Sequence, residues 1–110
     1  MSRPSRPVVV LVTASSEEEA VRIGRKLVED RLAACANIVP KIRSIFQWEG
    51  KVAEERECLV ILKTRGELLS EVEGAVLALH SYQVPEIIAL PIEGGSAPYL
   101  EWINEETRKR

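Results

Sequence analysis

Histidine and cysteine are scarce in this chain, which contains one histidine, His80, and two cysteines, Cys35 and Cys58. A single imidazole excludes a zinc site built from two histidines of one chain, although an oligomer could bring several copies together. The signatures G-x-G-x-x-G, G-x-x-x-x-G-K-[ST], H-E-x-x-H, C-x-x-C and G-x-S-x-G are also absent. The common nucleotide-binding, metalloprotease and hydrolase classes therefore receive no support from motifs.

The chain also lacks a large net charge and a long apolar run. Its 15 basic and 17 acidic residues give a formal net charge of -2, which creates no field to attract nucleic acid or an anionic membrane. Apolar runs such as "VVVLV" are far too short to span a membrane, and the initial "MSRPSRP" lacks the apolar core of a signal peptide. We expect a cytoplasmic protein with neither nucleic acid nor a membrane as a partner.

The 110 residues contain 45% apolar residues, enough for a core without disulfide or metal support. We expect residues 1–110 to form a single domain, with residues 1–6 disordered. A continuous apolar strand is predicted over residues 7–13, and the following "SSEEE" supplies a serine cap and a glutamate for a capping box. The helix that starts there is expected to reach about Leu32, and "AACANIV" then returns to strand character until Pro40 interrupts it.

The stretch 37–64 is predicted to form two strands joined by the turn residues Glu49 and Gly50. Helical spacing over residues 68–80 predicts a second helix, and "EIIALPI" predicts a fourth strand. "EGGSAP" then breaks the chain, and Pro98 suits the first turn of a last helix.

This order of elements predicts an α+β fold, a ferredoxin-like βαββαβ sandwich with a long hairpin between its second and third strands and a C-terminal helix. Proline removes a ladder donor, so Pro40 and Pro91 place the second and fourth strands at the edges of the sheet. The apolar segments "VVVLV" and "CLVIL" are then the central pair. Pairing Trp48 with Lys51 would place Cys58 about 20 Å along the ladder from Cys35, which argues against a disulfide and for a reducing compartment.

The half of the hairpin nearest its turn is expected to extend beyond the helices. Phe46, Trp48 and Val52 would then be exposed on a two-stranded ribbon, which is marginally stable in water and invites another chain. A second copy of the protein in closed cyclic symmetry is the simplest partner. The alternative is a mobile surface hairpin.

Few residues are candidates for chemistry. Either cysteine with His80 could form a nucleophile and base, but thiols within apolar segments are more often structural. His80 ends a predicted helix, where it could bind the terminal carbonyls or serve as a ligand. The segment "TASSEEE" after the first strand would repel a phosphate substrate, which argues against acylphosphatase-like chemistry on this fold.

The sequence resembles the CutA family of divalent-cation tolerance proteins. The matching segments are "RLAACANIVP", "SIFQWEGK", "LVILKT", "HSYQVPEIIALPI" and "PYLEWI", which occur in this order and lie within Val8 to Ile103. The resemblance implies a ferredoxin-like fold and a homotrimer in which the long hairpin pairs with neighbouring subunits. It also implies a role in tolerance of divalent metals, and no catalytic reaction.

Some members of the family bind copper, and the resemblance makes copper or another divalent cation the expected ligand, although none is required as a cofactor. The histidine pair and first-strand cysteine found in such members are replaced here at Leu79 and Val12, so only His80 remains. The usual proline after this histidine is Ser81, which is expected to loosen the turn. Copper favours imidazole and thiolate ligands, so His80 and Cys35 are the candidate metal ligands.

We therefore expect a homotrimer that binds divalent metal weakly, with Phe46, Trp48 and Val52 at the subunit interface and no enzyme activity. Two alternatives stay open. One is a small-molecule signalling trimer resembling the PII class, with effectors in clefts between subunits. The other is a trimeric protein-anchoring adaptor, since animal relatives in the family have been linked to anchoring of acetylcholinesterase.

Overall fold

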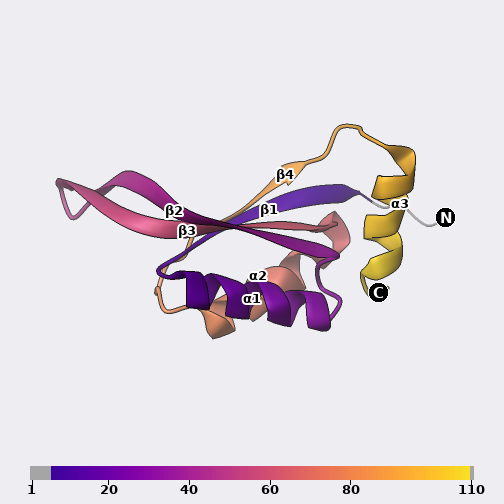
Figure 1. Ribbon diagram of the computed structural model, residues 1–110, viewed down its shortest axis with the longest axis horizontal. Coiled ribbons are helices and arrows are strands. Elements are labelled where there is room, and N and C mark those ends of the chain that lie inside the picture. The colour runs from indigo at the N-terminus through magenta and orange to yellow at the C-terminus, as the bar shows by residue number, and fades with distance from the viewer. Residues whose placement is uncertain (1–5, 110) are drawn as a thin grey trace.

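The computed structural model describes residues 6–109 and shows the predicted ferredoxin-like α+β sandwich (Figure 1). The elements are β1 (Pro7–Ala14), α1 (Glu17–Glu29), β2 (Cys35–Trp48), β3 (Lys51–Arg65), the 3-10 turn η1 (Gly66–Leu68), α2 (Leu69–Leu79), β4 (Ile87–Pro91) and α3 (Ala97–Glu106). The expected disorder of residues 1–6 lies outside the described residues, except at Arg6. The backbone of Arg6 is held at both ends, because its N–H donates to Glu67 and its carbonyl accepts from Gly66.

The four strands form one antiparallel sheet in the order β2-β3-β1-β4. The two apolar strands β1 and β3 are central, and the proline-containing strands β2 and β4 are at the edges, as predicted. β1 pairs with β3 from Pro7 opposite Arg65 to Ala14 opposite Cys58. β3 continues beyond the end of β1, and this continuation forms the far half of the hairpin.

Helices α1 and α2 lie side by side against one face of the sheet (Figure 1). Every second residue of β1 points to these helices, and the same alternation on β3 completes the core. The fully buried side chains of this core include Val10, Val12, Ile23, Leu27, Val60, Leu62, Leu68, Val72 and Val76. Among the described residues, no helix runs along the opposite face of the sheet, since α3 lies at the end of the sheet away from the hairpin (Figure 1).

Helix α1 begins as the sequence predicts and ends earlier than expected. Ser16 is its N-cap, and the Ser16 hydroxyl accepts a 3.1 Å hydrogen bond from the backbone N–H of Glu19. The helix ends at Glu29 rather than near Leu32, because Arg31 adopts a left-handed backbone conformation with φ of 58°. The backbone N–H groups of Leu32 and Ala33 then bond back to the carbonyl of Leu27.

Strand β2 passes through Pro40 instead of being interrupted there. Val39 pairs with Leu59 and Ile42 pairs with Glu57, so two residues of β2 lie opposite Cys58 alone. This β-bulge absorbs the proline, and Lys41 within it has a φ of 62°. Both cysteines are free, as the expected separation along the hairpin indicated.

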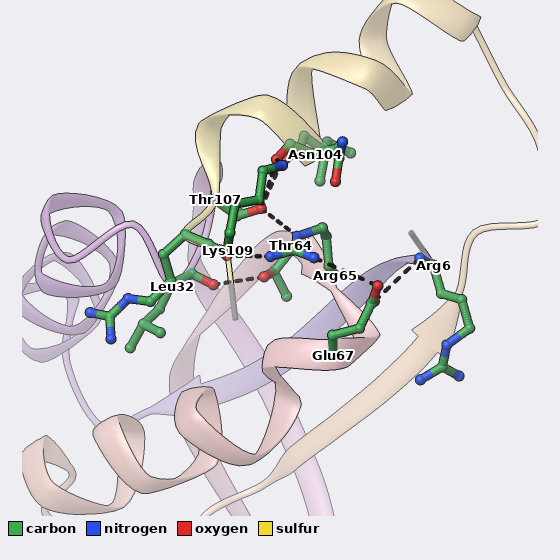
Figure 2. Close-up of polar contacts among 10 residues, drawn as sticks. Arg6, Leu32, Thr64, Arg65, Glu67, Asn104, Thr107 and Lys109 are labelled. Atoms are coloured by element: carbon green, nitrogen blue, oxygen red, sulfur yellow. Dashed lines mark hydrogen bonds and ion pairs between the residues drawn. The ribbon is translucent and has the colours of Figure 1, made fainter. Parts of the chain in front are cut away.

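The C-terminal segment is fixed by a buried arginine of β3 (Figure 2). Arg65 is 6% exposed, its Nε donates to Thr107 Oγ1 at 2.8 Å, and its Nη2 donates to the carbonyl of Arg108. Its Nη1 lies 3.6 Å from a carboxylate oxygen of Glu67. Beside it, Thr64 Oγ1 donates to the carbonyl of Leu32 at 2.6 Å. We call the contacts of Arg65 the C-terminal latch, because they hold the end of α3 against β3.

The far half of the hairpin makes the chain elongated. Its principal extents are 49 × 25 × 23 Å, with the hairpin along the long axis (Figure 1). Residues 51–57 of β3 pair only with β2 among the described residues, because β1 ends opposite Cys58. We call residues 42–57 the ribbon. The prediction of an overhanging hairpin is confirmed.

Candidate functional site

The ribbon exposes apolar side chains on both of its faces. Phe46 is 38% exposed, Trp48 59% and Val52 69%, so the three residues predicted for the subunit interface are accessible within the chain. Val52 lies opposite Gln47, and its side chain therefore leaves the ribbon on the face opposite to Phe46 and Trp48. A single covering surface could not bury both faces.

His80 is held by two hydrogen bonds at the end of α2. Its Nδ1 accepts from the backbone N–H of Tyr82 at 3.0 Å, and its Nε2 lies 2.6 Å from the carbonyl oxygen of Thr13 in β1. Because the N–H of Tyr82 can only donate, Nδ1 accepts and Nε2 carries the proton. His80 therefore binds a carbonyl of β1 rather than the carbonyls that end its own helix.

Tyr82 connects His80 to the base of the ribbon. The two rings lie 4.7 Å apart between centroids, and the Tyr82 hydroxyl donates to Glu57 Oε2 at 2.8 Å. Burial and then the hydrogen bond to Glu57 raise the pKa of Tyr82, which keeps this hydroxyl a donor. Glu57 is 9% exposed, so its carboxylate has a partner inside the protein.

Glu19 joins the start of α1 to the segment after α2. It is 4% exposed, and its Oε1 accepts from the Ser15 N–H while its Oε2 accepts from the Ser81 N–H, both at 2.9 Å. Burial alone would raise the pKa of Glu19, but the hydrogen bonds from Ser15 and Ser81 together lower it to about 2. Ser81 thus holds the turn with an N–H that a proline would lack, and does not loosen it.

Cys35 lies in a polar cluster on the sheet face that α1 and α2 leave uncovered. It is directly opposite Lys63, whose Nζ is 4.0 Å from the Cys35 sulfur. The side-chain oxygen of Asn37 is 3.6 Å from the same sulfur and also accepts a hydrogen bond from Lys63 Nζ. From α3, Tyr99 adds its hydroxyl: burial, the charge of Cys35 and a hydrogen bond with Cys35 raise the pKa of Tyr99.

The structure does not bring His80 and Cys35 together within one chain. Cys35 pairs with Lys63, whereas the His80 contact Thr13 pairs with Leu59, four positions further along β3. Four positions along a strand correspond to about 13 Å. A thiol–imidazole dyad in one chain is therefore excluded for this pair.

Metal coordination by one chain finds no ready set of ligands. Within residues 6–109, no three histidine, cysteine, aspartate or glutamate side chains are grouped closely enough to hold an ion. Two of the ribbon glutamates have partners in the chain, since Glu57 accepts from Tyr82 and Glu54 forms a 3.3 Å ion pair with Arg43. The separate positions of His80 and Cys35 offer single ligands only.

The described surface includes two open hollows. A groove of about 300 Å³ runs between α1 and the edge strand β2 and is lined mainly by Val21, Gly24, Val28, Ala36 and Ile38. A smaller one of about 160 Å³ lies where the ribbon meets the start of α1, and its lining includes Ser15, Lys41, Arg56 and Cys58. Both are open and shallow.

Several residues of these clusters were not predicted from the sequence, chiefly Lys63, Asn37, Tyr99 and Glu19 as a buried carboxylate. A count along the hairpin from Trp48 and Lys51 would place Thr64 opposite Cys35. The bulge shifts the register by one residue, so that Lys63 takes that place. The capping-box pattern was the one available signal for Glu19.

Comparison with known proteins places this fold in a named class. The model of the CutA1 divalent ion tolerance protein matches residues 8–106. The "Divalent-cation tolerance protein CutA" of Thermus thermophilus is 50% identical over 99 residues, which cover 90% of this chain and 96% of that protein. The "Protein CutA, chloroplastic" of Arabidopsis thaliana is 50% identical over 101 residues, 92% of this chain but 56% of that longer protein.

The fold agrees with the sequence comparison. The crystal structure of CutA1 from Oryza sativa superposes with a TM-score of 0.93 at 47% identity, covering 96% of each chain. The fold and the comparisons therefore define a class of small ferredoxin-like proteins, and relatives in this class are named divalent-cation tolerance proteins. The chain belongs to the CutA1 divalent ion tolerance family.

No helix in residues 6–109 combines the length and the apolar character needed to cross a membrane. The name of the Arabidopsis relative places that protein in the chloroplast. Cytoplasmic location of the present chain therefore stays a prediction.

Proposed function

We propose that this chain forms a homotrimer that binds copper or another divalent cation weakly and acts in divalent-cation tolerance in the cytoplasm, without catalysing a reaction. The observation that carries the assembly is the ribbon, with exposed Phe46, Trp48 and Val52 on two faces and an open β3 edge over residues 51–57. Burial of both faces and pairing of the edge require neighbouring chains on more than one side. Closed three-fold assembly supplies such neighbours to every copy.

Weak metal binding is supported by the state of the two candidate ligands. A cation at His80 would have to displace a hydrogen bond at one ring nitrogen, either to Thr13 or from Tyr82. A cation at Cys35 would meet the nearby ammonium group of Lys63. Since one chain offers only single ligands, copies in the assembly would have to contribute together to any tighter site.

Native mass spectrometry of the purified protein titrated with copper(II) measures both the number of chains in the assembly and the number of copper ions bound. We expect an assembly of three 12.3 kDa chains that takes up copper reversibly. The His80→Ala variant should keep the trimeric mass and lose most of the copper, because it lacks the imidazole ligand.

Cys35→Ser separates the two candidate ligands, and Cys58→Ala is its control because Cys58 is 6% exposed. A monomeric wild type would contradict the proposed assembly. Equal copper uptake by wild type, His80→Ala and Cys35→Ser would remove both residues as ligands. Retention of a small organic molecule by the native trimer would instead support the signalling alternative.

A further inference from the structure

Cys35 and Lys63 form a pair whose closeness is set by the backbone. They are directly opposite in the β2-β3 ladder, so their side chains leave the same face of the sheet. The Lys63 nitrogen lies 4.0 Å from the Cys35 sulfur, and the thiol is partly exposed. An amine and a thiol, both nucleophilic when deprotonated, are thus neighbours at a site that small solutes can reach.

A third side chain, Asn37, contacts both members of this pair. Asn37 Oδ1 accepts a hydrogen bond from Lys63 Nζ and lies 3.6 Å from Cys35 Sγ, so one amide oxygen contacts both reacting side chains. The pair is therefore held by contacts between β2 and β3.

No second thiol of the same chain can reach Cys35. Cys58 lies opposite Ala14 on the helix-covered face of the sheet and is 6% exposed. Sulfenic acids condense with a neighbouring thiol to a disulfide or with a backbone nitrogen to a sulfenamide, which shows that nitrogen can attack this sulfur. At Cys35 the nitrogen of Lys63 is the neighbouring nucleophile.

We propose that Cys35 and Lys63 form a reversible sulfur–nitrogen cross-link when the protein meets hydrogen peroxide. This inference is independent of the proposed metal binding and of the trimer. It gives Cys35 and Lys63 a redox role, in which a covalent bond between β2 and β3 forms when peroxide is present.

The chemistry takes two steps, and peroxide is the only oxidant. In the first step, the Cys35 thiolate attacks one oxygen of hydrogen peroxide and the O–O bond breaks. The sulfur is oxidised by two electrons to a sulfenic acid, and the other oxygen leaves as hydroxide, which takes up a proton to become water. In the second, the deprotonated Lys63 amine attacks the sulfenic sulfur, the S–O bond breaks, and the departing hydroxide takes the amine proton to form a second water. The product lacks two hydrogens relative to the reduced protein. An excess of a thiol reductant returns the thiol and the amine while becoming a disulfide itself.

The test is peptide mass spectrometry of the full chain after treatment with hydrogen peroxide in the presence of a metal chelator. We expect one cross-linked peptide pair joining Cys35 to Lys63, lighter by two hydrogens than the separate peptides and released by dithiothreitol. Cys58 should stay a thiol because it is buried.

Two variants separate the steps. Lys63→Arg keeps the positive charge but its guanidinium stays protonated, so oxidation should stop at a sulfenic acid that dimedone traps at Cys35. Lys26→Arg is the matched control on α1, where Lys26 pairs with Asp30, and it should cross-link as wild type does.

The proposal is overturned if Lys63 stays unmodified in wild type while Cys35 progresses to sulfinic acid. It is also overturned if Cys35 forms an intermolecular disulfide, or if the cross-link retains an oxygen atom between sulfur and nitrogen. Because a chelator is present and no assembly is required, a monomeric or copper-free protein leaves the expected result unchanged.

Discussion

Glu19 shows how a buried carboxylate can stabilise two turns at once. Its two oxygens accept backbone N–H groups from Ser15 and Ser81, which belong to segments far apart in the sequence. Both oxygens accept these N–H groups most strongly when the carboxyl group is deprotonated, because its single negative charge is then shared between them. Its lowered pKa is therefore linked to the free energy of unfolding.

Replacing Glu19 by Gln should destabilise the protein at neutral pH. The folded pKa of about 2 lies below the ordinary glutamate pKa of 4.5, so the ionised form contributes stability above the unfolded pKa, and this contribution is lost as pH falls through the folded pKa. The lowering corresponds to roughly 3 kcal/mol at most. We expect Glu19→Gln to lose about 1–3 kcal/mol near pH 7 and to approach wild type near pH 2.

Urea denaturation at matched protein concentration measures this difference. Glu18→Gln is the control, because Glu18 is an exposed neighbour in the same helical turn. A pH-independent difference between wild type and Glu19→Gln would show that the loss arises from altered packing and not from the charge.

The individual residues also show where sequence reasoning is limited. The separation of the two cysteines and the exposure of Phe46, Trp48 and Val52 were predicted, because both depend on strand periodicity near the turn. The residue opposite Cys35 was not predicted. One extra residue in the β2 bulge shifts the register, so that Lys63 instead of Thr64 lies opposite Cys35. The metal roles of His80 and Cys35 stay predictions.

At the scale of elements, the strand order followed from two prolines. Pro40 and Pro91 could not donate within a central strand, and both lie in edge strands. The end of α1 was placed too late because the turn at Arg31 carries neither glycine nor proline. How α3 docks was also beyond the sequence, since it depends on a buried arginine that looks like any charged residue at the end of a strand.

The C-terminal latch is expected to hold α3 in place. Arg65→Met keeps most of the buried aliphatic volume and removes the donors to Thr107 and to the carbonyl of Arg108. Loss of buried charge-assisted hydrogen bonds should cost about 2–4 kcal/mol. Hydrogen exchange of the α3 amides, Ala97–Glu106, should rise more than exchange in α1.

Arg56→Met serves as the matched control for the latch, because Arg56 is an exposed arginine on the same strand. It should leave exchange in α3 at the wild-type level. Equal exchange in α3 of Arg65→Met and wild type would show that apolar contacts, such as those of Ile103, hold the helix without the latch.

At the scale of the whole molecule, the ribbon is expected to be covered by neighbouring chains. Val52→Asp would place a charge in the proposed interface and should weaken assembly by about 2–3 kcal/mol, seen as a shift to lower native mass on dilution. Val84 is 82% exposed and lies outside the ribbon, so Val84→Asp is the control with the same chemical change. If neither substitution changes the native mass, the ribbon does not carry the assembly.

The open edge of β3 is also expected to affect the kinetics of folding and assembly. The sandwich of β1, β3, β4 and the two helices can form within one chain, so its folding rate is expected to be independent of protein concentration. Among the described residues, 51–57 pair with β2 alone, and their free edge can gain a neighbouring strand only after two folded chains collide. Refolding from denaturant should therefore show a fast first-order phase followed by a slower phase that accelerates as the protein concentration rises.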